Sequence, residues 1–138
     1  MRCYRFVDHT ADFGLQIFGS DAGDLFSNAA IALFDIIADP EGIQAEEQST
    51  IRVSGVDWPD LMVNWLRELL FQWNAKQRLV KTVRISKISE KKLVAHLRCD
   101  RFAPNRHVIK TEIKAVTYHQ IRVIQKAGQW EARVIFDV

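Results

Sequence analysis

The sequence lacks most of the motifs that identify enzymes. Its six glycines are scattered singly, so there is no glycine-rich phosphate-binding loop, and neither a nucleophile elbow nor an HExxH zinc-binding helix occurs. The only two cysteines, Cys3 and Cys99, form no CxxC pair, which disfavours a zinc knuckle. We expect both to be reduced thiols, because disulfides are rare in the cytosol.

Long apolar runs and a strong charge bias are also missing. No stretch approaches the ~20 apolar residues that a membrane span needs, and the first residues lack the apolar core of a signal peptide. Nineteen Lys and Arg against 17 Asp and Glu give a net charge of +2, which does not favour a dedicated nucleic-acid groove. We therefore expect a cytoplasmic protein without membrane contact, and a single domain over residues 1–138.

Apolar residues follow two periodicities. Helical spacing predicts helices over residues 22–38 and 59–76, the second starting at Asp57-Trp58-Pro59. Period-two alternation predicts strands at 3–7, 13–18, 51–56, 83–89, 93–99, 113–126 and 129–137. No internal repeat or linker stands out. The order of elements predicts an α+β, two-layer fold, with both helices packed on one face of a mainly antiparallel sheet.

Carboxylates near both ends of the sequence are candidate metal ligands. Asp8 and Asp12 flank a turn, and carboxylates beside backbone carbonyls suit a hard cation such as Ca²⁺ or Mg²⁺. Alone, aspartates in a turn are usually structural. Asp137, however, closes a strongly apolar strand, where solubility explains an acid poorly. If the first and last strands are neighbours, Asp12 and Asp137 converge on one cation.

Lys114 is the second unusual residue, because it lies between apolar residues in the predicted strand 113–126. One interpretation is an exposed lysine paired with Glu112, a pair that contributes only ~0–1 kcal/mol. The other is a positive charge aimed at a phosphate or an acidic partner. The alternation also favours a hydrogen-bonded core position for His119 and a solvated strand face for His96.

Three segments together resemble the archease family: Asp8-His-Thr-Ala-Asp-Phe-Gly14, Lys110-Thr-Glu-Ile-Lys-Ala-Val-Thr-Tyr-His119 and Val134-Ile-Phe-Asp-Val138. The resemblance covers essentially the whole chain. It implies a small, non-catalytic accessory protein of the tRNA-splicing RNA ligase, which joins 2′,3′-cyclic-phosphate or 3′-phosphate ends to 5′-hydroxyl ends. Such proteins promote guanylylation of the ligase's active-site histidine and its multiple turnover.

The resemblance also assigns roles to residues. It implies a divalent cation, Ca²⁺ or Mg²⁺/Mn²⁺, bound by Asp12 and Asp137 with a main-chain oxygen of Val138. The functionally important lysine of the family matches Lys114, which would contact the partner or a phosphate. The ligase is then the protein partner, and RNA is met only indirectly. One departure is Phe13, where an aliphatic residue is usual in the family.

Two other functions use residues of the same sequence. A metal-dependent phosphoesterase or nuclease would use the same acids, but it needs an activated water and usually more acidic ligands. An RNA-binding module would use Arg101, Arg106, His107 and Lys110. The near-neutral net charge and the lack of a row of exposed aromatic residues weigh against this second alternative.

Overall fold

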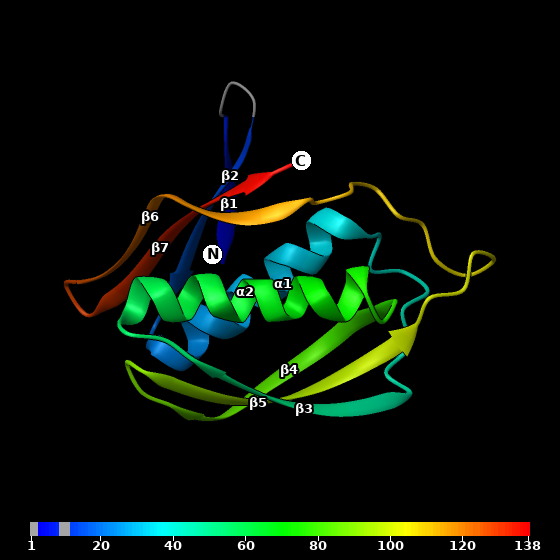
Figure 1. Cartoon of the computed structure of the whole chain (residues 1–138), viewed down its shortest axis with the longest axis horizontal. Coiled ribbons are helices and arrows are strands. Elements are labelled where there is room, and N and C mark those ends of the chain that lie inside the picture. Colours follow the sequence, from blue (N-terminus) through cyan, green and yellow to red (C-terminus); the bar gives the residue numbers. More distant parts are fainter. Residues whose placement is uncertain (1–2, 9–11) are drawn as a thin grey trace.

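The structure, a computed structural model, describes residues 3–8 and 12–138, with the backbone alone at Asp8 and Asp12. His9, a motif residue, lies outside the described part. Seven strands and two helices follow one another along the chain (Figure 1). They are β1 (Tyr4–Asp8), β2 (Asp12–Gly19), α1 (Ala22–Ile37), β3 (Glu47–Ser54), α2 (Trp58–Asn74), β4 (Arg78–Ile88), β5 (Lys92–Arg101), β6 (Ala115–Lys126) and β7 (Gln129–Asp137).

The strands form two antiparallel sheets, β1-β2-β7-β6 and β3-β5-β4. The α+β class is confirmed, but the prediction of one sheet with both helices on one face is wrong. The helices lie between the sheets: α1 contacts β2 and β4, and α2 contacts β6 and β3 (Figure 1). The reason is that α1 is apolar on more than one side, and such a helix must be covered on more than one side.

The start of α1 is built from a short polar turn. The side chain of Asp21 accepts a hydrogen bond from the N–H of Asp24 at 2.7 Å, and Asp24 Oδ2 accepts one from the N–H of Ser20 at 2.9 Å. This reciprocal arrangement satisfies N–H groups that a helix start leaves without partners. Gly19 is needed for close approach, because a Cβ there would lie 2.4 Å from Leu25 N.

The same turn recurs at the start of α2. Asp57 accepts from the N–H of Asp60 at 2.9 Å, and Asp60 Oδ2 accepts from the N–H of Val56 at 2.9 Å. A Cβ on Gly55 would lie 2.6 Å from Leu61 N. Both starts share the pattern Gly-x-Asp-x-x-Asp-Leu-x-x-Asn. The expectation of no internal repeat is therefore wrong, because a strand–turn–helix unit occurs twice. The repeat is hard to recognise in the sequence because its two copies share few identical residues.

The core fills the space between helices and sheets. Trp65 is fully buried, and its indole Nε1–H donates to the carbonyl of Phe26 at 2.8 Å, so the polar end of the largest core residue has a partner. Ala132, Val134 and Phe136 of β7 are buried in the core. Among the described residues, neither helix combines the length and the apolar run needed to cross a bilayer.

Strand β4 begins at Arg78, earlier than the predicted start near Val83. A register shift between Val80 and Thr82 breaks its pairing with β5. Such an irregularity inserts an extra residue and resets the alternation of buried and exposed side chains. The sequence pattern therefore starts to read as a strand only after the shift.

Candidate functional site

The two ends of the described chain meet in the four-stranded sheet. Strand β2 pairs with β7 along its length, and Asp12 lies directly opposite Asp137 in the register. On the other side of β7, Ala115 is paired with Asp137, and the N–H of Lys114 donates to Asp137 O at 2.8 Å. The last strand therefore neighbours the second strand, β2, and not the first strand, β1, but β2 is the strand that begins at Asp12. The backbone brings Asp12, Asp137 and Lys114 to one end of one sheet (Figure 1).

The side chains at this end of the sheet face solvent where they are described. Phe136 is fully buried, whereas Asp137, the last residue of β7, is exposed and Val138, just beyond the strand, is 38% exposed. Carboxylate and main-chain oxygens are the ligands that hard divalent cations prefer. Within residues 3–8 and 12–138, no three described His, Cys, Asp or Glu side chains are grouped to hold a metal ion.

The sequence suggested that Lys114 lies within a strand, but in the structure it lies just before one. Strand β6 begins one residue later, and the alternation does not extend back through Lys114: Ile113 and Val116 are both buried, while Lys114 and Glu112 are exposed. Lys114 and Glu112 therefore do not share a face with Val116, as regular alternation along a strand 113–126 would require. Lys114 instead ends the segment that leads into β6, with its backbone fixed to the last strand.

His119 lies on the surface, so the prediction of a core histidine is wrong. The pairing of β6 with β7 is irregular between Thr117 and Arg122, and Gln120 has a φ of 54°. This bulge shifts the alternation of β6. The hydroxyl of Thr117 donates to Ile135 O at 2.9 Å and accepts from the N–H of His119 at 3.3 Å, which fixes the start of the bulge.

A polar cluster joins the start of α2 to the segment 110–119. Tyr118 donates its hydroxyl proton to Asp60 at 2.6 Å, and the guanidinium of Arg67 lies 4.7 Å from the centre of the Tyr118 ring. Arg67 also donates to the carbonyl of Val116 at 3.1 and 3.2 Å. The hydrogen bond from Tyr118, with one from the Val56 N–H, holds the pKa of Asp60 below its ordinary value, and the same bond raises the pKa of Tyr118.

Comparison with known proteins decides the family. The model of the family described as Archease protein family (MTH1598/TM1083) matches residues 4–138. The chain belongs to the archease family. It is 34% identical to Protein archease of Archaeoglobus fulgidus over 98% of both chains, and 32% identical to Protein archease of Methanosarcina mazei over 98% of this chain and 95% of that one.

Solved structures agree with the family fold. The solution structure of Methanobacterium thermoautotrophicum protein 1598 is 29% identical, with a TM-score of 0.83 over all of both chains. A crystal structure from Thermotoga maritima, described as an archease and possible chaperone, is 22% identical, with a TM-score of 0.66 over 96% of this chain and 94% of that one. The second likeness concerns the fold alone.

The loop that the sequence offered as an RNA-binding surface has another role in this archease-family chain. His107 is 5% exposed, and its Nε2 lies 2.9 Å from Oδ2 of Asp100, which is itself 2% exposed. Arg106 contacts both oxygens of the same carboxylate at 2.9 and 3.1 Å. Arg101 lies 3.4 Å from Glu47. Three of the four residues proposed to contact RNA therefore face acids of the protein itself.

The Asp100 cluster anchors the start of the segment that leads to Lys114. The Nδ1 of His107 accepts from the N–H of Ala103 at 2.9 Å, so the ring proton lies on Nε2 and is donated to Asp100. Burial alone would raise the pKa of Asp100. Hydrogen bonds from the Gln44 N–H, His107 and Arg106 outweigh burial and hold that pKa below its ordinary value.

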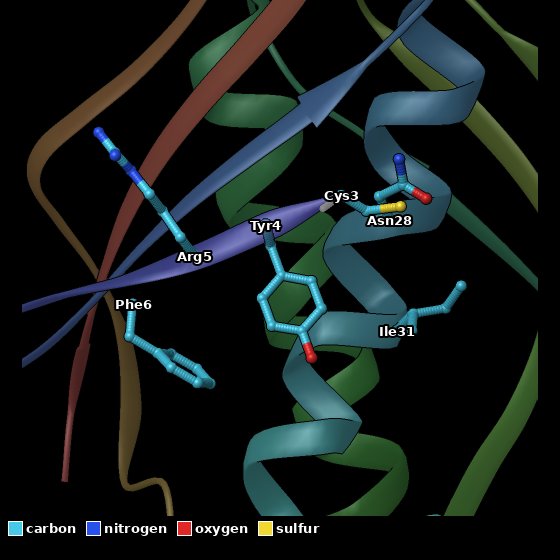
Figure 2. A pocket seen from close by; sticks show the side chains of 6 residues that line it. All are labelled: Cys3, Tyr4, Arg5, Phe6, Asn28 and Ile31. Carbon is cyan, nitrogen blue, oxygen red and sulfur yellow. The ribbon is translucent and has the colours of Figure 1, made fainter. Parts of the chain in front are cut away.

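A hollow of about 360 Å³ lies between strand β1 and α1. Figure 2 shows its lining residues, with Tyr4 and Phe6 on one side of β1 and Arg5 on the other. Phe6 and Ile31 are about half exposed, and Arg5 donates to Gln16 at 2.6 Å. Its lining, as far as the structure describes it, contains no carboxylate, and the hydroxyl of Tyr4 donates to Asp35 Oδ2 at 2.5 Å.

Proposed function

We propose that this protein activates a tRNA-splicing RNA ligase by promoting its guanylylation and multiple turnover, without catalysing ligation itself. The observation that carries the proposal is the register of β2 against β7. It places Asp12 opposite Asp137, and the N–H of Lys114 donates to Asp137 O at 2.8 Å. All three residues fall in the segments that resemble the archease family.

We propose further that Asp12, Asp137 and the main-chain oxygen of Val138 hold a divalent cation, Ca²⁺ or Mg²⁺/Mn²⁺. Residues directly opposite each other in an antiparallel pair have Cβ atoms ~4.5–5.5 Å apart. That separation suits two carboxylates that share one ion, and all the donors are oxygens, so the set fits a hard cation. When bound, such an ion supplies compact positive charge at the end of the sheet. Lys114, exposed beside it, adds an ammonium for a phosphate or an acidic group of the ligase.

The proposed mechanism is a shift between conformations of the ligase. An activator shifts such an equilibrium only by as much as it binds one conformation more tightly than the other. Typical coupling free energies of ~1–3 kcal/mol correspond to ~5–150-fold changes. The role of Asp12, Asp137 and Lys114 is then to bind the conformation that accepts guanylylation more tightly.

The test is guanylylation of the ligase by labelled GTP in the presence of Asp12→Ala, Asp137→Ala or Lys114→Ala. We expect each substitution to abolish activation while the circular dichroism spectrum is retained, because Asp137 and Lys114 are exposed. Glu90→Ala, in the exposed turn between β4 and β5, is the matched control and should activate normally. Full activation by both aspartate variants would exclude the site, and turnover of cyclic-phosphate RNA without ligase would favour the phosphoesterase.

A further inference from the structure

The three-stranded sheet has one face that the helices do not cover. Along β3, Ile51 and Val53 are buried against the helices, whereas Thr50 and Arg52 are exposed. Strand β5 alternates in the same way, with Leu93, Ala95 and Leu97 buried. This is the pattern of an antiparallel sheet with one face in the core and the other in solvent. The uncovered face points away from the helices (Figure 1).

The uncovered face carries cations and no outward carboxylate. Its exposed charged residues are Arg52, Arg84, Lys87, Lys92 and Arg98. Strands β3, β4 and β5, which are fully described, contain only two acids, Glu47 and Asp100. Glu47 lies within 4 Å of two arginines, and Asp100 is buried against Arg106 and His107. Although the net charge of the whole chain is only +2, positive charge is concentrated on this face.

The cations are regularly placed. Successive cross-strand rows of outward residues are Gln48–Arg98–Thr82, Thr50–His96–Arg84, Arg52–Val94–Lys87 and Ser54–Lys92. Each row holds at least one Lys or Arg. Residues two apart along a strand are separated by ~6.8 Å. Successive rows are therefore ~6.8 Å apart, and because the cations are distributed over all three strands, the positive charge is spread over the whole face.

Neutral donors lie among the cations. A shallow depression of about 320 Å³ is lined by Thr50, Thr82, Arg84, His96 and Arg98 among others. The His96 ring bridges two hydroxyls, with Nδ1 3.0 Å from Thr50 Oγ1 and Nε2 3.1 Å from Ser86 Oγ, so the row is preformed. The outward rows hold no Phe, Tyr or Trp to stack on bases. Such a surface suits contacts to a phosphate backbone, which carry affinity without sequence preference.

We propose that the outer face of the β3-β5-β4 sheet binds the phosphate backbone of an RNA strand, with Arg52, Arg84, Lys87 and Arg98 as its principal contacts. The choice of RNA among polyanions rests on the proposed function beside an RNA ligase. The face and the Asp137 end belong to different sheets, separated by the helices (Figure 1). One molecule can then hold RNA on one sheet while the other sheet meets the ligase, so RNA is contacted directly and not only through the enzyme.

The test is fluorescence anisotropy of a short labelled single-stranded RNA with this protein alone, over a series of salt concentrations. The variant is Arg52→Gln/Arg84→Gln/Lys87→Gln, and the matched control is Arg122→Gln/Lys126→Gln/Arg133→Gln on the exposed surface of β6 and β7. Each lost phosphate contact lowers the slope of log K against log salt by ~0.7, so we expect a fall of ~2 for the variant. Affinity should fall at least about tenfold in the variant and little in the control.

Two results of this assay would overturn the proposal: no salt-dependent binding by the wild type, or equal losses in variant and control. In a separate pull-down of the ligase, binding that weakens with the variant while RNA binding does not would also overturn it, because the face would then dock an acidic protein surface instead of RNA. The anisotropy assay contains no ligase, so its failure leaves the proposed activation untouched. Conversely, RNA binding that depends on this face would stand even if Asp12→Ala and Asp137→Ala activated the ligase fully.

Discussion

Replacing Asp100 by alanine should destabilise the protein substantially, although Asp100 looks like an ordinary charged residue near the end of β5. Its carboxylate is 2% exposed and accepts hydrogen bonds from His107, Arg106 and the N–H of Gln44. Truncation removes the acceptor and leaves these donors without it. The substitution therefore tests whether this cluster anchors the chain before Lys114.

The size of the effect depends on which donors water can reach. The side chain of His107 is fully buried, so its Nε2–H is left unsatisfied at a cost of ~1–3 kcal/mol. The side chain of Arg106 is 40% exposed and Gln44 is exposed, so solvent replaces most of what those groups lose. Adding ~1 kcal/mol for these two gives an expected loss of ~2–4 kcal/mol in the free energy of unfolding.

The effect should also depend on pH in a defined direction. The folded pKa of Asp100 lies below its ordinary value, so its stabilisation is present above the unfolded pKa of ~3.9 and is lost as pH falls through the folded pKa. The difference in stability between wild type and Asp100→Ala should be constant near neutral pH. It should shrink below about pH 4.

Urea unfolding followed by tryptophan fluorescence measures this difference, with Glu90→Ala as a control that should change stability by less than ~0.5 kcal/mol. A double-mutant cycle with His107→Ala should give a coupling energy of ~0.5–3 kcal/mol, because the two side chains are in direct contact. A loss below ~1 kcal/mol for Asp100→Ala, or strict additivity in the cycle, would refute the anchoring role.

Two further outcomes follow from the fold. Gly19→Ala should lower the free energy of unfolding in urea by ~1–3 kcal/mol, because the added Cβ would lie 2.4 Å from Leu25 N. Gly23→Ala is the control and should not destabilise, since its added Cβ would lie 3.5 Å from the nearest atom; equal effects of the two substitutions would contradict the close-approach argument. Burial raises the pKa of the Cys99 thiol to about 11. A thiol reagent should therefore modify only the exposed Cys3 in the folded protein, and Cys99 only after denaturation. Rapid modification of both cysteines in the folded protein would contradict the burial of Cys99.

Local signals in the sequence predicted much of the fold. The Asp57-Trp58-Pro59 pattern predicted the start of α2 to within a residue, because capping chemistry is decided by neighbours in sequence. Acids near both ends of the chain suggested that its first and last strands pair; the register instead pairs β7 with the second strand, β2, which still places Asp12 opposite Asp137. The first signal is a short-range pattern and the second is a single hypothesis about which strands pair. One sequence can support inferences of these two kinds.

The features that were missed depend on tertiary contacts. The bulge at Gln120, where a residue other than glycine has a positive φ, turned His119 from an expected core position to the surface. The sequence offered His107 as part of an RNA-binding surface, because nothing local indicates that it is buried against Asp100. The division into two sheets also escaped prediction, since alternation shows that a strand exists but not which sheet it joins.

The central claim is that Asp12 of β2 and Asp137 of β7, which lie opposite each other, make this protein an activator of the proposed partner ligase. The most direct measurement is RNA ligation with substrate in large excess over the partner ligase, scored as products per ligase molecule. With wild-type protein we expect many turnovers, and with Asp137→Ala about one, the level reached by ligase alone. Many turnovers with Asp137→Ala, or no gain from the wild type, would contradict the claim.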